Sequence, residues 1–271
     1  MTIANMEVAT ELTQKPPSNI DEAKLSPEWD EWKIAMQQEL NSMVENDVYD
    51  LVDRPPNKNI IKNRWVFAYK QGKQHKFKAR LVAKGFTQKY GIDYSETFSP
   101  TAHYDSLKLL LALSAKFKLH CLQMDVKTAF LNANLEEEIY MEQPQDAVHN
   151  DNKKVWKLKK AIYGLKQAPR AWFETLYFFL KHLGFKNCSS DNSIFVSKSD
   201  SDITIILVYV DDLLIFASKL HDLNCMKDKL CQKFKMNEVE NSENFIGFSI
   251  FRNENNGSIS INQNSFVQNL I

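Results

Sequence analysis

The spacing of apolar and polar positions predicts helices interspersed with hairpin-linked strands. Apolar residues recur every three or four positions from Trp29 to Met43, which predicts an amphipathic helix capped by Ser26 with Pro27 at its first position. The runs RWVFAYK (64–70) and HKFKARLVAKG (75–85) flank the polar link QGKQ and are typical of a two-stranded hairpin. This mixture favours an α+β fold over a doubly wound parallel sheet.

The rest of the chain continues the same mixture. Apolar periodicity of the helical kind predicts helices over residues 106–118, 171–185 and 220–234, the second of them closed by Gly184. Strand-like runs occupy residues 119–126, 193–197, 203–210, 213–218 and 244–253.

The second strand of the first hairpin separates apolar from basic side chains. Side chains on a strand alternate between its two faces, so Phe77, Ala79, Leu81 and Ala83 point one way. The opposite face carries the cations Lys76, Lys78, Arg80 and Lys84. A solvated strand edge protected against aggregation explains this row, and so does a polyanionic ligand.

Composition limits the protein class without choosing a function. The 271 residues have a formal net charge of zero, yet residues 54–84 contain ten Lys and Arg and no Asp or Glu. Such local patches bind polyanions even in a neutral chain. The four cysteines lack a zinc-site or disulfide-framework spacing, and neither a targeting signal nor an apolar membrane span is visible. We expect an intracellular protein that does not contact a membrane.

Two adjacent carboxylates, Asp211 and Asp212, interrupt the apolar run ITIILVYVDDLLIFA (203–217). A solvent-exposed turn would explain them, because aspartate is common in turns. A third carboxylate, Asp125, stands near the end of another apolar strand, LHCLQMDV, and could join them if the strands are neighbours. Oxygen-only clusters of this kind suit Mg²⁺ or Mn²⁺, and a basic strand face nearby would hold the phosphates that such ions bridge.

Five motifs in order resemble the reverse transcriptase of copia-type LTR retrotransposon Pol polyproteins. They are KARLVAKGFTQKYGIDYSETFSP, LQMDVKTAFLNANLEEEIYMEQP, YGLKQAPRAW, YVDD and NFIGFSI. The resemblance implies a right-hand polymerase fold with fingers and palm, and a thumb that is largely truncated. It implies RNA-directed and DNA-directed DNA polymerisation from dNTPs on a primed RNA or DNA template, with two Mg²⁺ or Mn²⁺ ions.

The resemblance also assigns residues to roles. The catalytic, metal-binding positions match Asp125, Asp211 and Asp212. The dNTP-binding positions match Lys78, Arg80, Phe130 and Gln167, with Phe130 as a steric gate against a 2′-hydroxyl. The primer and template positions match Lys166, Arg170, Tyr209, Ile246, Gly247 and Phe248.

The domain division implied by the resemblance begins with a flexible lead, residues 1–27, before the reverse transcriptase domain, residues 28–271. Within it, the fingers are expected at residues 28–118 and 144–165, and the palm at residues 119–143 and 166–251. Residues 252–271 are expected to begin a thumb or connection. RNase H, protease and integrase motifs are absent from the sequence. We therefore expect a piece of a polyprotein, working in a cytoplasmic particle or the nucleus, of undetermined oligomeric state.

Two other functions use the same residues. A catalytically silent nucleic-acid-binding remnant would bind template and primer without adding nucleotides. A two-metal nuclease or phosphatase would use the carboxylates, but it leaves Lys78, Arg80, Phe130 and Gln167 without a role.

Overall fold

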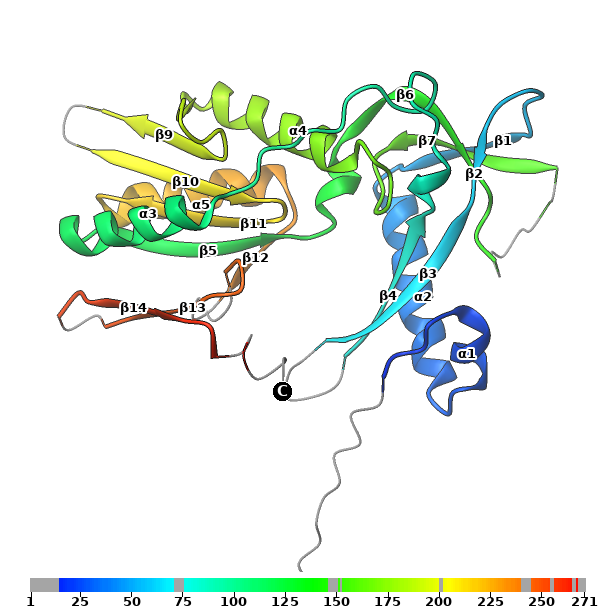
Figure 1. The fold of residues 1–271 in the computed structure, drawn as a ribbon, viewed down its shortest axis with the longest axis horizontal. Helices are drawn as coiled ribbons and strands as arrows, with labels where there is room; N and C mark the ends of the chain where they lie inside the picture. Colours follow the sequence, from blue (N-terminus) through cyan, green and yellow to red (C-terminus); the bar gives the residue numbers. More distant parts are fainter. Residues whose placement is uncertain are drawn as a thin grey trace, which may run out of the picture.

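A six-stranded antiparallel sheet forms one half of the structure, in the order β12-β5-β11-β10-β9-β8 (Figure 1). This computed structural model describes residues 15–70, 76–145, 151, 153–199, 202–239, 245–253, 256–264 and 267. The sheet strands are β5 (His120–Val126), β8 (Lys186–Asn187), β9 (Ile194–Lys198), β10 (Ile203–Tyr209), β11 (Asp212–Ala217) and β12 (Met236–Val239). The α+β class expected from the sequence is confirmed.

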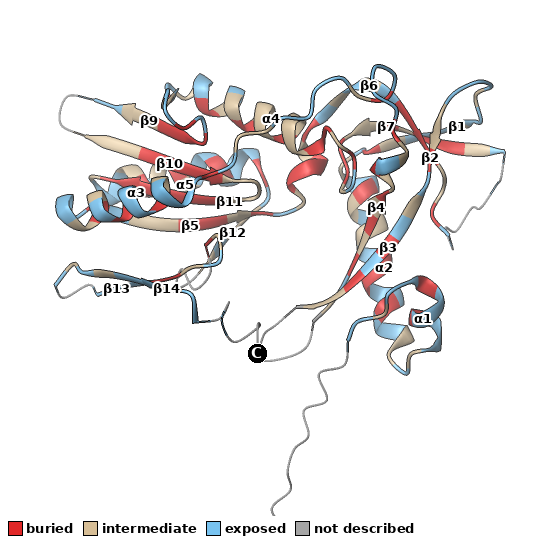
Figure 2. Cartoon of the chain, viewed as in Figure 1, coloured by how far each residue is buried: buried red, intermediate tan, exposed pale blue. Residues whose placement is uncertain are grey.

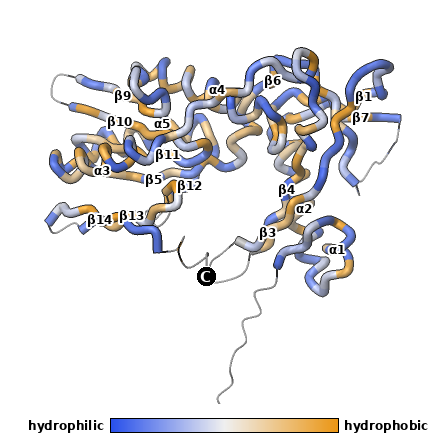
Figure 3. The backbone as a smooth tube through the Cα atoms, viewed as in Figure 1, coloured by the Kyte–Doolittle hydropathy of each residue, from blue (hydrophilic) through white to orange (hydrophobic). Residues whose placement is uncertain are grey.

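Both faces of this sheet are buried at its centre (Figure 2). One face belongs to a hydrophobic cluster that includes residues of α3 (Tyr104–Phe117), and its sheet members include Ile205, Leu207, Leu214 and Phe216. The other belongs to a larger cluster with α4 (Ala168–His182) and α5 (Leu220–Lys233), and its sheet members include Ile206, Val208, Leu213 and Ile215. Because both faces are covered, β10 and β11 are apolar at consecutive positions (Figure 3).

The other half contains a four-stranded sheet and a separate hairpin. The sheet has the order β1-β7-β6-β2, with β1 (Tyr49–Asp53), β2 (Ile60–Ile61), β6 (Asn134–Met141) and β7 (Lys154–Lys160). The hairpin of β3 (Asn63–Lys70) and β4 (Lys76–Ala83) forms as the sequence predicted, and its expected link, QGKQ, lies outside the described residues. Trp32 of helix α2 (Trp29–Glu45) packs its ring against Phe67 and Phe77 of this hairpin.

The expectation of a flexible lead over residues 1–27 is wrong for its last part. Ile20–Leu25 form helix α1, in which Ile20 and Ala23 are buried. Helix α2 begins at Trp29 instead of Pro27, and Ser26 Oγ accepts a hydrogen bond from the Glu28 backbone N–H at 3.1 Å. Residues 1–14 lie outside the described part of the chain.

Short elements complete the fold. The 3₁₀ helices η1 (Gly85–Thr87) and η2 (Ala129–Asn132) follow β4 and β5, and β13 (Ser249–Arg252) pairs with β14 (Ile259–Asn262). All four cysteines are free thiols. Among the described residues, none of the helices has the length and apolar character that a membrane crossing requires.

Candidate functional site

The two adjacent aspartates stand where β10 turns into β11. Tyr209 is paired with Asp212, so Val210 and Asp211 form a two-residue turn. Val210 has a φ of 54°, a left-handed conformation that a β-branched residue adopts only under strain. The indole N–H of buried Trp172 in α4 donates to the Val210 carbonyl oxygen at 2.6 Å. The long helix therefore holds the turn in its strained form.

The third aspartate, Asp125, is brought beside this turn by the strand order. Asp125 in β5 is directly paired with Asp212 in β11, and the Val126 N–H donates to the Asp211 carbonyl oxygen at 2.8 Å. Asn237 of β12 is paired with Asp125 from the other side. The structure thus gathers the three carboxylates that the sequence singled out.

The crowded, half-buried positions of these carboxylates raise the pKa values of two of them. Burial, and then the nearby charge of Asp125, raises the pKa of Asp211. Burial, followed by the charges of Asp211 and Asp125, raises the pKa of Asp212 to about 6. The Gln123 side chain offers Asp212 a long hydrogen bond of 3.5 Å. Negative charge is therefore concentrated here and only partly offset by Arg80 and Lys78, so a bound cation would stabilise the charged carboxylates.

The raised pKa of Asp212 predicts a pH-dependent stability difference. The folded chain prefers the protonated carboxyl, so this group's contribution to stability is full below its ordinary pKa of 3.8 and is lost as pH rises through about 6. We expect Asp212→Asn to unfold at the same temperature as the unaltered chain near pH 4, and at a higher temperature at pH 7. Thermal unfolding in EDTA at a series of pH values measures this difference. A difference independent of pH would contradict the assignment.

These carboxylates fit a hard divalent cation in their chemistry. Among the described residues, no three His, Cys, Asp or Glu side chains converge on a single point as a preformed metal cage. Mg²⁺ does not require one, since it keeps several waters and usually takes one or two carboxylates together with substrate phosphates. Asp125 and Asp211 line the same cavity, with Asp212 next to them. This donor set suits Mg²⁺ or Mn²⁺.

A basic wall faces the carboxylates across this cavity of about 440 Å³. Lys78 and Arg80 of β4 line it together with Asp125 and Asp211. Ala79 also borders it, but Ala79, Leu81 and Ala83 are buried, whereas Lys78 is exposed and Arg80 is partly exposed. The predicted alternation of cationic and apolar positions is therefore confirmed from residue 77 to residue 83. The cavity joins cations suited to phosphates with carboxylates suited to metal ions.

Two predicted nucleotide-contacting residues do not line this cavity. Phe130 is only 7% exposed and lies beneath Tyr163, with ring centroids 4.6 Å apart. Gln167 is buried, and its side-chain amide bonds to Gln88, Asp93 and Glu137. Gln167 lines a separate cavity of about 760 Å³.

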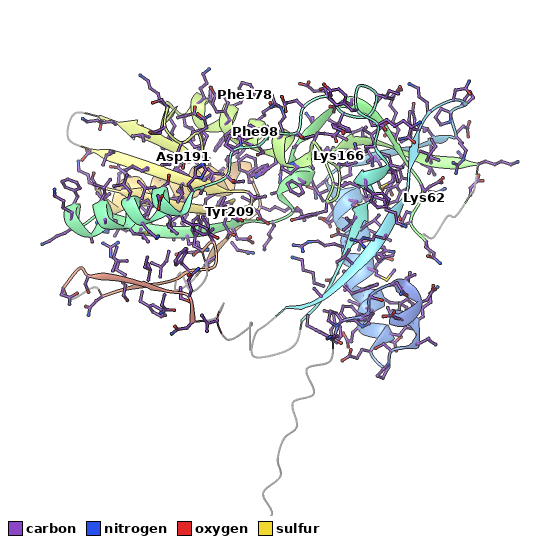
Figure 4. The ribbon with its side chains drawn as sticks, viewed as in Figure 1. Lys62, Phe98, Lys166, Phe178, Asp191 and Tyr209 are labelled. Atoms are coloured by element: carbon purple, nitrogen blue, oxygen red, sulfur yellow. The ribbon has the colours of Figure 1, made fainter. Side chains whose placement is uncertain are left out.

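Lys166 and Arg170 also lie away from the aspartates. The Lys166 ammonium group donates to the Tyr94 hydroxyl at 3.0 Å, and Arg170 pairs with Glu174 at 2.9 Å. Figure 4 shows Lys166 and Tyr209 at separate places along the molecule. Neither cation lines the cavity between the basic strand and the aspartates.

The predicted primer-contacting segment approaches the sheet face that carries Asp125 and Asp212. Phe245 and Phe248 exchange backbone hydrogen bonds of 2.9 and 3.0 Å around Ile246 and Gly247, whose φ angles are 53° and 75°. Ile246, Phe248 and Tyr209 pack against the hydrophobic cluster on that face. The expected continuous strand over residues 244–253 is thus a tight turn followed by β13, and residue 244 lies outside the described chain.

Sequence reasoning gave no site role to most of the remaining cavity wall, which includes Glu39, Lys127, Tyr163 and Asn237. Burial raises the pKa of Glu39, which accepts a hydrogen bond from the Leu81 N–H at 3.3 Å. Its spacing of three and four residues from Met36 and Met43 could have shown that it faces inward. Tyr163 stands inside the motif YGLKQAPRAW but received no role from it.

The family model and the curated relatives that this chain matches agree on one family. Residues 46–271 match the family model described as "Reverse transcriptase (RNA-dependent DNA polymerase)". The retrovirus-related Pol polyprotein from transposon TNT 1-94 of Nicotiana tabacum is 37% identical over 262 residues, covering 95% of this chain and 20% of the relative. That from transposon RE2 of Arabidopsis thaliana is 42% identical over 228 residues, covering 82% of this chain and 16% of the relative. The chain thus spans a fifth or less of these relatives.

Among solved structures, the foamy viral protease-reverse transcriptase in complex with double-stranded DNA is similar in part. The TM-score is 0.46 at 13% sequence identity, with 89% of this chain and 37% of that chain covered. A similarity this low does not assign a position or a role to any individual residue of this chain.

Proposed function

The chain belongs to the reverse transcriptase (RNA-dependent DNA polymerase) family, and from this premise we propose that it catalyses template-directed nucleotide addition. The substrates are a dNTP and a primer 3′-hydroxyl on an RNA or DNA template. One observation carries the proposal: Lys78 and Arg80 share a single cavity with Asp125 and Asp211. This pairing suits a metal-bound polyphosphate.

Asp125, Asp211 and Asp212 would hold two Mg²⁺ or Mn²⁺ ions. Such ions lower the pKa of the attacking hydroxyl and neutralise charge on the triphosphate and the leaving pyrophosphate. The strained turn at Val210, fixed by Trp172, presents Asp211 to the cavity without a flexible linker. Rigid presentation of this kind lowers the reorganisation needed during reaction.

The basic wall orients the triphosphate. The exposed Lys78 supplies a compact point charge, and Arg80 supplies a planar fork that matches two phosphate oxygens. The turn at Ile246 and Gly247 brings main-chain atoms toward the same sheet face, where a primer terminus would lie. Phe130 packs against Tyr163 and Gln167 is held by its amide partners, so we assign neither of them a direct contact with the triphosphate in this cavity.

Primer extension with removal of metal tests the proposal. We expect the chain to add dNTPs to a DNA primer on an RNA template in Mg²⁺, to stop in excess EDTA, and to resume when Mg²⁺ is restored. A DNA template in place of RNA tests the DNA-directed reaction. Denaturing electrophoresis of a labelled primer gives the readout.

Two outcomes would replace this proposal. Binding of template and primer that weakens steeply with salt, without incorporation in either Mg²⁺ or Mn²⁺, would indicate a silent nucleic-acid-binding remnant. Cleavage of the labelled strand without incorporation would indicate a two-metal nuclease.

A further inference from the structure

We infer that Tyr163 is a positioning residue for nucleotide addition: its ring holds the Arg80 guanidinium on the cavity wall, ready for the triphosphate. The inference rests on the proposed function, because it gives Arg80 a polyphosphate to bind. It concerns a side chain to which the motif comparison assigned no role.

The backbone of Tyr163 is fastened to the strand that carries Arg80. The N–H of Ala83, the last residue of β4, donates to the Tyr163 carbonyl oxygen at 2.8 Å. The next residue, Gly164, has a φ of 93°, and its Cα approaches the Ala83 carbonyl so closely that a Cβ could not fit. Residue 163 therefore has a fixed position relative to Arg80, which is three residues from Ala83.

The aromatic ring of Tyr163 contacts both Arg80 and Phe130. The Arg80 guanidinium carbon is 4.6 Å from the centre of the Tyr163 ring, within the range of a cation–π contact. The buried Phe130 ring packs against the Tyr163 ring in a T-shaped contact, with centroids 4.6 Å apart and an interplanar angle of 62°. Phe130 thus restricts the movement of Tyr163, and Tyr163 restricts the movement of Arg80.

Nearby carboxylates make this restriction necessary. Asp211 and Glu39 line the same cavity, and Arg80 is close enough to influence both electrostatically. A long cationic side chain without an aromatic support would turn toward either carboxylate. That would remove a triphosphate ligand and place a competing cation at the metal-binding aspartates. The Tyr163 ring attracts the guanidinium, and the Tyr163 hydroxyl accepts a hydrogen bond from one of its five N–H donors, so both hold Arg80 on the wall.

Binding of inorganic tripolyphosphate in EDTA tests the inference without catalysis. We expect Tyr163→Leu to weaken binding about tenfold, equivalent to a lost cation–π contact of about 1.4 kcal/mol. Tyr163→Phe keeps the ring and should stay within about threefold of the unaltered chain. The matched control is Tyr140→Leu, because Tyr140 also has a cation, Lys157, 6.0 Å from its ring centre but does not line this cavity. Calorimetric titration gives the dissociation constants.

Steady-state primer extension adds a second readout. In Tyr163→Leu we expect the KM for dNTP to rise about tenfold while kcat changes less, with recovery in Tyr163→Phe. Unchanged tripolyphosphate binding in Tyr163→Leu, or an equal loss in Tyr140→Leu, would overturn the inference. So would the absence of tripolyphosphate binding by the unaltered chain. The expected binding pattern without any primer extension would uphold the role of Tyr163 and overturn the proposed function.

Discussion

Replacement of Asp211 with Asn is expected to abolish nucleotide addition and to leave the metal-free chain folded and slightly more stable. Asn preserves the shape of the side chain but removes the charge that a divalent ion requires. A loss of at least about a thousandfold is expected, equivalent to about 4 kcal/mol of transition-state stabilisation. The readout is the rate of single-nucleotide addition in Mg²⁺.

The gain in stability follows from the environment of Asp211. Burial and the charge of Asp125 raise its pKa, so the charged carboxylate opposes folding at neutral pH. Removing that charge should raise the unfolding temperature in EDTA by about 2 °C, a small shift because water screens this half-buried group. The charged carboxylate therefore lowers the stability of the metal-free fold while it gives the site its ability to bind a cation.

The matched control is Asp228→Asn, the same chemical change at an exposed position on α5. It should change neither the rate of nucleotide addition nor the unfolding temperature measurably. Extension that survives in Asp211→Asn would show that the metal assignment is wrong. A fall in its unfolding temperature would show that the carboxylate stabilises the metal-free fold.

The central sheet and its aspartates were predictable because their patterns are strong. Runs that are buried on both faces are apolar at every position, so a carboxylate pair inside one is conspicuous. The basic face of β4 follows directly from the alternation of side chains along a strand. Both patterns depend only on neighbouring positions in the sequence, so tertiary contacts do not alter what they predict.

Other features lack a local pattern strong enough to predict them. Gln167 is held by Gln88, Asp93 and Glu137, which come from two distant segments. Helix α1 has only six residues, too short for a clear apolar period. The turn at Ile246 lacks the Asn or Asp usual at such a position, so its pattern indicated a strand. Tertiary contacts fix Gln167, whereas α1 also has a local signal, because the Asn19 side chain accepts a hydrogen bond from the Glu22 N–H at 2.9 Å and caps the helix.

Replacement of Gly164 with Ala is expected to destabilise the fold by about 3 kcal/mol or more. Gly164 has a φ of 93°, where any side chain is strained. A Cβ would also overlap the Ala83 carbonyl oxygen and crowd the Val82 side chain, so the loop and β4 would have to separate. Separation would break the hydrogen bond from the Ala83 N–H to the Tyr163 carbonyl oxygen.

Gly184→Ala separates the cost of the steric overlap at Gly164 from the cost of placing a side chain at a positive φ. Gly184, after helix α4, has a similar φ of 88°, but a Cβ there meets no atom within 4 Å. Its replacement should cost only about 1 kcal/mol, the strain alone. Chemical denaturation gives both free energies of unfolding, and equal losses would contradict the close contact. A larger loss in Gly164→Ala, together with weaker tripolyphosphate binding, would link the packing of this loop to the position of Arg80, because the same hydrogen bond fixes Tyr163.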